Sequence, residues 1–378
     1  MKAQVVGWGR YVPQRVLTND DLSRVVDTTD EWISTRTGIR ERRLVEEGET
    51  TSRMAVHAAR QALEVAGLSP AQLDLIIVAT VTPDYPFPAT ACLVQDALGA
   101  SHAAAFDLSA GCTGFVYGLS VAAHLLSGGV HQTALVIGAE TLSRITDWAD
   151  RNTCVLFGDG AGAVALQANE SEGGVLATVL GADGSGGDLL RVLAGGSQMP
   201  ASHRTVTEGL HFIQMRGREI FRFAVRIIPT ATREVLEDAG LSLADLDLLV
   251  PHQANQRIIE AATRALDLSS EEVYSNLERY GNTSAASIPI ALSEAVEEGL
   301  IQPGSLVACV GFGAGLTWGA AAIRWTHPQP APAPRWRRFL RRLRYGLAVL
   351  RSWLRRSVRW LAALWTRDVL GDGRGRDA

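Results

Sequence analysis

Two stretches of the chain share one order of polar and hydrophobic positions. The segments LEVAGLSPAQLDLII (63–77) and LEDAGLSLADLDLLV (236–250) align without gaps, and ten of their fifteen positions are identical. In each, a helical pattern ends at a glycine typical of a helix C-cap, and a short loop leads into an apolar run that predicts a buried strand. The repetition predicts two related halves, residues 1–170 and 171–325.

Further apolar runs lead into glycine-rich segments at matching places in both halves. They are LVIGAE (135–140) and FGDGAGAVAL (157–166) in the first half and LVACVGFGAGLTWGAAAI (306–323) in the second. The alternation of helices and strands predicts an α/β fold with mostly parallel sheets. Sites in such folds form beyond the carboxyl ends of strands, so residues that follow strands are the first candidates.

The composition is typical of a globular protein: 47% of the 378 residues are hydrophobic and 20% are charged. No apolar run approaches the roughly 18 residues of a membrane span, and the N-terminus lacks the features of a signal peptide, so we expect a cytoplasmic protein. The cysteines stand singly, which predicts neither a disulfide framework nor a zinc site. They are Cys92, Cys112, Cys154 and Cys309.

Charge is distributed unevenly along the chain. Residues 1–326 carry 23 Lys and Arg against 37 Asp and Glu, whereas residues 327–378 carry 13 against 3. A Pro-rich linker (326–334) separates this basic tail (335–378) from the acidic body.

The tail has a helical pattern with segregated faces. Its arginines, including Arg337, Arg341, Arg344, Arg355 and Arg359, lie apart from an apolar arc of about 120°. A basic amphipathic helix with Trp at its apolar boundary favours an anionic membrane surface, here through residues 335–365. Docking on the protein's own acidic body or a partner, and binding of nucleic acid, are the alternatives. The apolar arc holds Trp336, Phe339, Leu340, Leu343, Leu347, Leu350, Leu354 and Leu361.

Cys112 is the first candidate for chemistry. In FDLSAGCTGFVYGLS (106–120), a strand-like run ends, small residues follow, and a helical pattern begins. A thiol at a helix N-terminus has a lowered pKa, because free N–H groups and the helix dipole stabilise the thiolate. A buried structural cysteine is the alternative from this stretch alone.

Two residues of the second half could assist such a thiol. His252 follows the predicted strand LDLLVP, and Asn282 lies in small residues that precede a helix. Taken alone, Asn282 is more often a helix cap. The segment GFGAGLTWG (311–319) lacks the phosphate-binding glycine patterns and instead favours backbone N–H groups close to a reacting carbonyl. HQAN has no second ligand at helical spacing, which argues against a metal.

Six separated motifs resemble the β-ketoacyl-acyl carrier protein synthase III family over residues 1–325. The resemblance implies a thiolase-like αβαβα fold in five layers, built from two duplicated halves, with the basic tail outside the family pattern. It also implies a homodimer and no cofactor, because acyl-CoA is a substrate. The motifs are DTTDEWISTRTGIRERR (27–43), AGCTGF (110–115), DRNTCVLFGDGAGA (150–163), PHQANQRII (251–259), GNTSAAS (281–287) and GFGAGLTWGAA (311–321).

The resemblance implies a decarboxylative condensation. Cys112 would take an acyl group from acyl-CoA, with the backbone N–H groups of Cys112 and Ala314 as the oxyanion hole. His252 and Asn282 would bind the malonyl thioester carbonyl of malonyl-acyl carrier protein. The product would be a 3-oxoacyl-carrier protein, and the reaction would initiate type II fatty acid synthesis.

The resemblance further implies two sets of binding residues. Thr28, Trp32, Arg36, Phe87, Arg151, Gly217 and Phe221 would contact CoA or the acyl chain, with Phe87 favouring a short starter such as acetyl. Gln253, Ala254, Asn255, Gln256 and Arg257 would meet the carrier protein. A relative that uses longer acyl-CoAs in specialised metabolism and a catalytically silent, membrane-associated scaffold are the alternatives.

Overall fold

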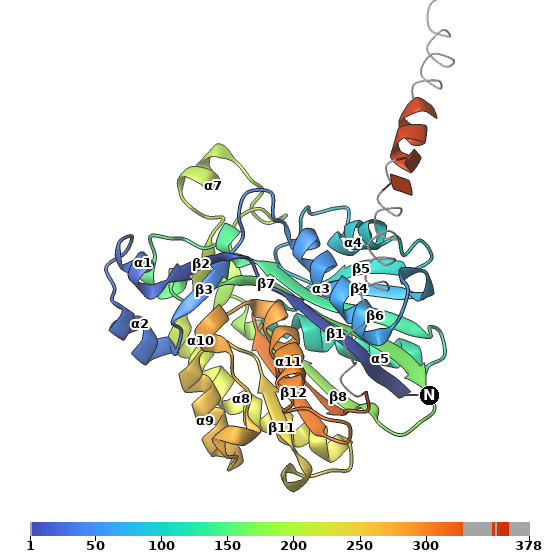
Figure 1. Ribbon diagram of the computed structural model, residues 1–378. Coiled ribbons are helices and arrows are strands. Elements are labelled where there is room, and N and C mark those ends of the chain that lie inside the picture. Colours follow the sequence, from blue (N-terminus) through green and yellow to red (C-terminus); the bar gives the residue numbers. More distant parts are fainter. Residues whose placement is uncertain (1, 328–349, 352–353, 363–378) are drawn as a thin grey trace, which may run out of the picture.

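The computed structural model of the chain describes residues 2–327, 350–351 and 354–362. The body of the described chain consists of two large β-sheets, the helices α5 and α11 between them, and helices on both outer faces, with two further two-stranded sheets among the loops (Figure 1). This is the predicted αβαβα order of layers.

The first sheet is formed by strands from residues 2–169, in the order β1-β7-β6-β4-β5. β6 pairs in parallel with β4, and β4 with β5, so their carboxyl ends lie at one edge of the sheet. β5 has no further neighbour in the sheet and forms its free edge. The strands are β1 (Lys2–Tyr11), β4 (Leu75–Ala79), β5 (Ala104–Leu108), β6 (Thr133–Thr141) and β7 (Asp159–Asn169).

The second sheet has the order β11-β12-β13-β8; β11 and β12 are parallel, and the pairs β12-β13 and β13-β8 are antiparallel. In the first sheet β7 is antiparallel to both β1 and β6, so the prediction of mostly parallel sheets is wrong and both sheets are mixed. β13 follows β12 after a turn of three residues, and a connection this short joins only antiparallel neighbours.

The strands of the second sheet come from residues 174–324, so each sheet draws on one of the two predicted halves; the duplication itself stays a prediction. The strands are β8 (Gly174–Ala182), β11 (Leu248–Pro251), β12 (Leu306–Gly313) and β13 (Thr317–Arg324).

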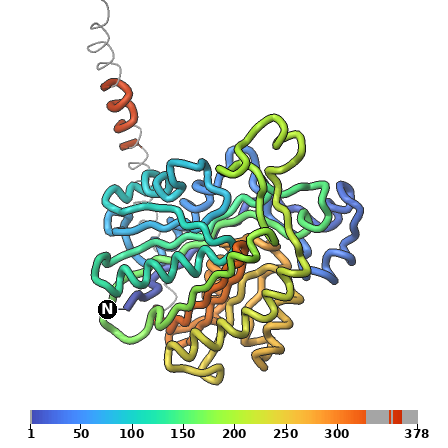
Figure 2. The backbone as a smooth tube through the Cα atoms, turned by 180° about the vertical axis from the view of Figure 1, so that it is seen from behind, coloured from blue at the N-terminus to red at the C-terminus, as the bar shows by residue number. Residues whose placement is uncertain are grey.

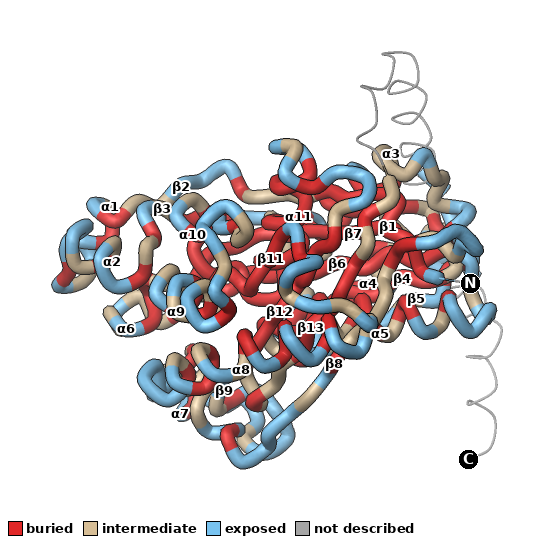
Figure 3. The backbone as a smooth tube through the Cα atoms, turned by 90° about the horizontal axis from the view of Figure 1, so that it is seen from below, coloured by how far each residue is buried: buried red, intermediate tan, exposed pale blue. Residues whose placement is uncertain are grey.

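The three largest hydrophobic clusters of the described residues hold the layers together. One lies between the sheets around α5 (Gly114–Ser127) and α11 (Ser287–Glu297). The second packs α3 (Thr51–Ala66) and α4 (Thr90–Leu98) on the first sheet, and the third packs α8 (Gly217–Asp238) and α9 (Gln256–Leu266) on the second. Figure 3 shows that buried residues concentrate in the sheets and that exposed residues lie on the outer elements.

Shorter strands and helices cover one end of the two large sheets. The tube in Figure 2 shows this end of the molecule from behind. They are β2 (Arg15–Thr18), β3 (Glu41–Leu44), β9 (Leu190–Val192), β10 (Ile213–Met215), α1 (Asn19–Ser23), α2 (Asp30–Thr37), α6 (Arg151–Cys154), α7 (His203–Thr207) and α10 (Leu277–Tyr280).

Much of the predicted tail helix and its linker lies outside the described residues. Residues 350–351 and 354–362 are helical, and Leu350, Leu354 and Trp360 are about half or more exposed, at 52%, 49% and 64%. Arg356 forms an ion pair with Asp96 of α4 at 2.5 Å.

Candidate active site

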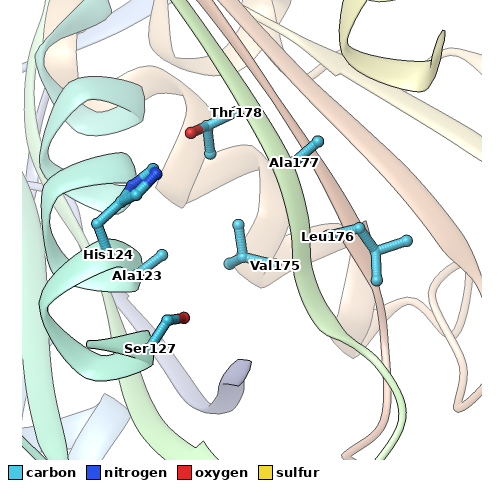
Figure 4. Close-up of a pocket in the computed structure, with 7 residues that line it drawn as sticks. All are labelled: Ala123, His124, Ser127, Val175, Leu176, Ala177 and Thr178. Carbon is cyan, nitrogen blue, oxygen red and sulfur yellow. The ribbon is translucent and has the colours of Figure 1, made fainter. Parts of the chain in front are cut away.

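Two of the cavities in the described part of the chain are each lined by a histidine, and their chemistry differs. A groove of about 280 Å³ lies between α5 and β8, where His124 and Ser127 face Val175 and Thr178 (Figure 4). The His124 ring bonds the carbonyl of Ser120 in its own helix at 2.8 Å. The Thr178 hydroxyl bonds Ser120 Oγ at 2.7 Å, and among the described residues no hydrogen bond joins His124 to the hydroxyl of Ser127 or Thr178, so this groove is a poor candidate for catalysis.

The other cavity, of about 220 Å³, gathers most of the predicted site residues. Its lining runs from Trp32 and the exposed Arg36 inward to Cys112, His252 and Asn282. The three inner residues are 8%, 1% and 7% exposed, so reacting groups are shielded from water. We call it the central cavity. Gly217, Phe221, Ala254 and Asn255 also line it.

Cys112 lies in a three-residue 3-10 turn, Gly111–Thr113, between β5 and α5. This is the strand-to-helix turn that the sequence predicts. The prediction of a lowered thiol pKa is wrong. Burial raises the pKa of Cys112 to about 12; a hydrogen bond with Ser284 acts in the opposite direction and the charge of Glu140 raises it further. With this pKa the thiol is protonated at neutral pH.

Two backbone N–H groups meet beside the thiol because glycines leave room for them. A Cβ at Gly111 would lie 2.9 Å from Ala314 N, and one at Gly313 would lie 2.6 Å from Cys112 N. Gly111 also has a φ of +56°, which favours glycine. The amides of Cys112 and Ala314 are therefore neighbours, as an oxyanion hole requires.

His252 follows β11, and its ring is fixed from two sides. Its Nδ1 lies 2.6 Å from Ser287 Oγ, and its ring meets Phe312 edge to face with centroids 5.2 Å apart. Burial lowers the pKa of His252 to about 3, so the imidazole is neutral at physiological pH. Ser287 Oγ already accepts the Gln253 N–H at 3.4 Å, so we assign its hydroxyl proton to Nδ1, and Nε2 then carries the ring proton and is a donor.

Asn282 is held by its backbone and by its own side chain. Its N–H donates to Leu156 O at 2.8 Å, and its carbonyl accepts from Gly158 N at 3.0 Å. Its Oδ1 accepts the Ser284 N–H at 2.8 Å. Because the oxygen is engaged, the amide Nδ2 is the part left for a ligand in the cavity.

Arginines and an aromatic ring form the outer part of the site. The guanidinium carbons of Arg36 and Arg151 lie 4.5 and 4.9 Å from the Trp32 ring centroid. Thr28 is 9% exposed, and its buried hydroxyl has no hydrogen-bond partner in the described chain. This surface offers cationic and aromatic contacts to an anionic ring system.

The predicted carrier-protein segment is only partly accessible. Arg257 is exposed and lies 5.9 Å from the Phe221 ring centroid, beside the cavity. Gln253 is 1% exposed, and its amide bonds Pro251 O at 2.7 Å and accepts Asn276 N at 3.1 Å. Gln253 therefore shapes the loop after β11 rather than offering its side chain to a docking protein.

Ala254, Asn255 and Gln256 are half-buried between α2 and α9. Asn255 caps α9 through Arg257 N at 2.9 Å and donates to Arg36 O at 3.0 Å, which joins the cavity mouth to α9.

Phe87 lies away from the central cavity of its own chain. It is 86% exposed in the loop between β4 and α4, near Tyr85, which is 55% exposed. Phe106 on the free edge strand β5 is also exposed, at 37%.

Sequence reasoning missed the residues that orient the inner groups. Ser287 belongs to the GNTSAAS motif and Phe312 to the GFGAGLTWG motif, so both motifs were noticed without these roles. Their link to His252 is visible only once α11 and β12 pack against the end of β11. Within the described residues, no group of three or more His, Cys, Asp or Glu could hold a metal.

The five-layer αβαβα fold, with a cysteine, a neutral histidine and an asparagine at the inner end of one cavity, is that of the thiolase-fold proteins. Two segments match family descriptions: residues 106–184 match "3-Oxoacyl-[acyl-carrier-protein (ACP)] synthase III" and residues 236–325 its C-terminal part. The chain belongs to this family.

Relatives are similar over almost their whole length. The chain is 57% identical over 324 residues to the beta-ketoacyl-[acyl-carrier-protein] synthase III of Caldanaerobacter subterraneus, covering 86% of this chain and 98% of that one. It is 58% identical over 321 residues to that of Symbiobacterium thermophilum, covering 85% and 97%. The crystal structure of the Aquifex aeolicus enzyme matches with a TM-score of 0.79 and 50% identity, covering 85% and 100%. The predicted family and fold are confirmed.

No helix among the described residues combines the length and hydropathy that crossing a bilayer requires.

Proposed function

We propose that the chain condenses a short acyl-CoA, acetyl-CoA above all, with malonyl-acyl carrier protein. The products are 3-oxoacyl-carrier protein, CO₂ and CoA, and the reaction initiates type II fatty acid synthesis. The observation that carries this proposal is the convergence of Cys112, His252 and Asn282 on one buried cavity.

In the first half-reaction, Cys112 attacks the acyl-CoA thioester and becomes acylated. The tetrahedral oxyanion accepts hydrogen bonds from the N–H groups of Cys112 and Ala314. Gly111 and Gly313 allow these two amides to lie close together. A thiolate serves as nucleophile here and as leaving group later, as transfer between thioesters demands.

In the second half-reaction, malonyl-carrier protein loses CO₂ and leaves an enolate. His252 Nε2–H and Asn282 Nδ2 donate to the thioester oxygen, where negative charge grows in the transition state. A neutral imidazole suits this role because it keeps its donor without needing to lose or gain a proton. The carbanion then attacks the acyl-cysteine and releases Cys112.

The cavity mouth binds the nucleotide part of CoA. Trp32 stacks on the adenine, Arg151 and Arg36 contact ring and phosphates, and Thr28 supplies its unpartnered hydroxyl. Gly217 and Phe221 border the passage that the pantetheine arm follows to Cys112. Arg257, exposed beside that passage, attracts the acidic carrier protein.

The active form is a homodimer. β5 presents an unpaired strand edge, and Phe106, Tyr85 and Phe87 expose apolar surface beside it. A second copy would pair this edge and cover these side chains, and Phe87 would then reach the partner's acyl pocket and limit the length of the starter.

The basic tail, 335–365, holds the cytoplasmic enzyme on an anionic membrane surface. The support is the segregation of arginine from leucine and tryptophan along it, together with the exposure of Leu350, Leu354 and Trp360. Full-length protein should sediment with phosphatidylglycerol vesicles at low salt, and a 1–326 truncation should not. Equal sedimentation of both would refute the membrane role.

An acyl-CoA panel tests the central proposal. Acetyl-, isobutyryl- and octanoyl-CoA are offered with malonyl-carrier protein, and 3-oxoacyl-carrier protein is measured by mass spectrometry. Preference for octanoyl-CoA would contradict the short starter and favour a role in specialised metabolism. Absence of any acyl mass on Cys112 would leave only the silent scaffold.

A further inference from the structure

The two backbone amides of the proposed oxyanion hole come from opposite halves of the chain. The Cys112 N–H lies in the turn between β5 and α5, and the Ala314 N–H lies in the short connection between β12 and β13. Gly111 and Gly313 let these segments approach, but within residues 2–327 no backbone hydrogen bond joins them. Another group must therefore fix the separation of the two amides.

The Thr317 hydroxyl is the group that links the two segments. Thr317 is the first residue of β13, and its Oγ1 lies 3.0 Å from Ala110 O and 3.1 Å from Ala314 O. Ala110 comes two residues before Cys112, and Ala314 carries the second amide. One hydroxyl therefore bonds the backbone on both sides of the oxyanion hole.

Thr113 supplies the hydrogen bond that orients this hydroxyl. Thr113 Oγ1 and Thr317 Oγ1 are 3.0 Å apart. The carbonyls of Ala110 and Ala314 can only accept, so they share the Thr317 proton, and the Thr113 proton points at Thr317 Oγ1. Thr113 has 0% exposure, so water does not compete for its hydroxyl.

Packing leaves the Thr317 side chain in one orientation. A Cβ at Gly315 would lie 2.9 Å from Thr317 Cγ2, so glycine leaves the space that this methyl group fills. Rotation about χ1 is restricted in a β-branched residue, and with the methyl group held here the hydroxyl faces the two carbonyls. In the described chain neither Thr113 nor Thr317 lines the central cavity, so their effect on a substrate passes through the backbone.

We propose that Thr317 is a positioning residue that holds the N–H groups of Cys112 and Ala314 at the spacing the thioester oxyanion requires. The inference rests on the acyl transfer proposed above and identifies the group that sets the geometry of that step. An oxyanion hole is effective when its donors are in place before charge develops, because they then need not reorganise during the reaction. A displacement of about 1 Å can cost about 100-fold in rate.

Replacing the hydroxyl by a methyl group forces the two segments apart. A methyl carbon stays at least about 3.3 Å from a carbonyl oxygen, whereas the Thr317 oxygen lies 3.0 and 3.1 Å from its two acceptors. Thr317→Val keeps the shape and the strand propensity of threonine and removes only these hydrogen bonds. It therefore displaces the amides with little change to the rest of the fold.

The turn that carries Asn282 is held by other contacts. A Cβ at Gly138 on β6 would lie 2.0 Å from Ala285 O, so only glycine lets this turn rest directly on the strand. Ser284 Oγ donates to Glu140, two residues further along β6, at 3.1 Å. The proposed donor to the malonyl thioester should therefore stay in place when the threonine hydroxyl is removed.

Two reactions of the same thiol separate this role from a general disturbance of the site. Acetyl-CoA acylates Cys112 through a tetrahedral oxyanion, whereas iodoacetamide alkylates it without forming one. Both rates are followed in the full-length protein by the mass of the peptide that contains Cys112. Thr317→Val should be acylated at least about tenfold more slowly and alkylated within about twofold of the wild-type rate.

The second half-reaction provides a further readout. Decarboxylation of malonyl-carrier protein, measured without acyl-CoA by the intact mass of the carrier protein, depends on His252 and Asn282 in the proposed mechanism. Its rate in Thr317→Val should stay within about twofold of the wild type. Thr317→Ser keeps the hydroxyl and should recover most of the acylation rate.

Thr178→Val is the matched control. Thr178 lies on β8, the strand beside β13, and its hydroxyl bonds Ser120 Oγ of α5 at 2.7 Å. This change also removes a threonine hydroxyl that links the two halves, but away from the oxyanion hole, so acylation should keep the wild-type rate. Thr317→Ala removes the same hydroxyl as Thr317→Val and replaces that variant if it fails to fold.

Acylation at the wild-type rate in Thr317→Val, or in Thr317→Ala, overturns the inference. Equal slowing of acylation and of either alkylation or decarboxylation also overturns it, because the whole site would then be disturbed. So does slowing of the same size in Thr178→Val, or no recovery in Thr317→Ser. If no acyl-CoA labels wild-type Cys112, the proposed function itself fails and takes the inference with it; labelled wild type with unaffected Thr317 variants refutes the inference alone.

Discussion

The two helices between the sheets begin in similar ways but contribute different chemistry. α5 follows a 3-10 turn that starts at Gly111 with a φ of +56°, and α11 follows one that starts at Ser284 with a φ of +50°. The first turn bears Cys112, the proposed nucleophile. The second turn lies between Asn282, the proposed donor to the substrate, and Ser287, which bonds His252.

The residue at the positive φ reveals what each turn must accommodate. Gly111 lies against Ala314 N, so a side chain there would separate the amides of the oxyanion hole. Ser284 adopts a strained backbone conformation that places its hydroxyl 3.1 Å from Glu140 Oε1, to which it donates. At Gly111 the conformation allows a backbone amide to approach closely, whereas at Ser284 it positions a side-chain hydroxyl.

The largest effects should separate the turns by half-reaction. Cys112→Ala should form no acyl-enzyme, whereas His252→Ala and Asn282→Ala should still be acylated by acetyl-CoA. In the latter two, condensation should fall by about 10²–10³-fold, because a donor to the enolate is lost. Intact mass and single-turnover assays measure the two steps. Loss of acylation in Asn282→Ala would contradict the separation.

Ser287→Ala should reduce malonyl decarboxylation by about tenfold and leave acyl transfer unchanged, since only the His252 tautomer loses its support.

In the wild type, the rate of malonyl decarboxylation should not fall between pH 8 and pH 5 through protonation of His252. Its folded pKa is about 3, so the imidazole stays neutral as the pH is lowered over this range. A decarboxylation rate that decreases as the pH is lowered through 6.5 would contradict the neutral donor.

Stability should distinguish the two positive-φ positions. Gly111→Ala should lower the free energy of unfolding by at least about 1–2 kcal/mol, because alanine is strained there and its Cβ meets Ala314 N. Ser284→Gly should be nearly neutral, since relief of a similar strain offsets a lost hydrogen bond of about 1 kcal/mol. Urea unfolding of both variants measures this, and equal losses would remove the distinction.

A surface change should leave the comparison of the turns intact. Arg257→Glu should raise KM for malonyl-carrier protein several-fold at low salt and leave kcat and KM for acetyl-CoA unchanged, since attraction to an acidic partner is screened by ions. Arg264→Glu, on the last turn of α9, is the matched control. An equal response of both variants would mean that net charge, not the place of Arg257, matters.

The sequence predicts the residues at strand ends better than the contacts between them. Cys112 and His252 follow strands that apolar runs identify, because period and turn chemistry are local. Glu140 ends the noticed segment LVIGAE, but its partner Ser284 is 144 residues away. No local pattern records that pairing. The raised pKa of Cys112 was missed for the same reason, since burial by distant segments outweighs the helix terminus.

Gly138 has a consequence for how the site comes into being. The turn that carries Ser284 can rest on β6 only through this bare position, so the second half must be fully docked on the first before any reacting group finds its partner. Activity therefore depends on how the two halves dock: a chain whose halves are folded but incorrectly docked would contain every proposed catalytic residue and be inactive.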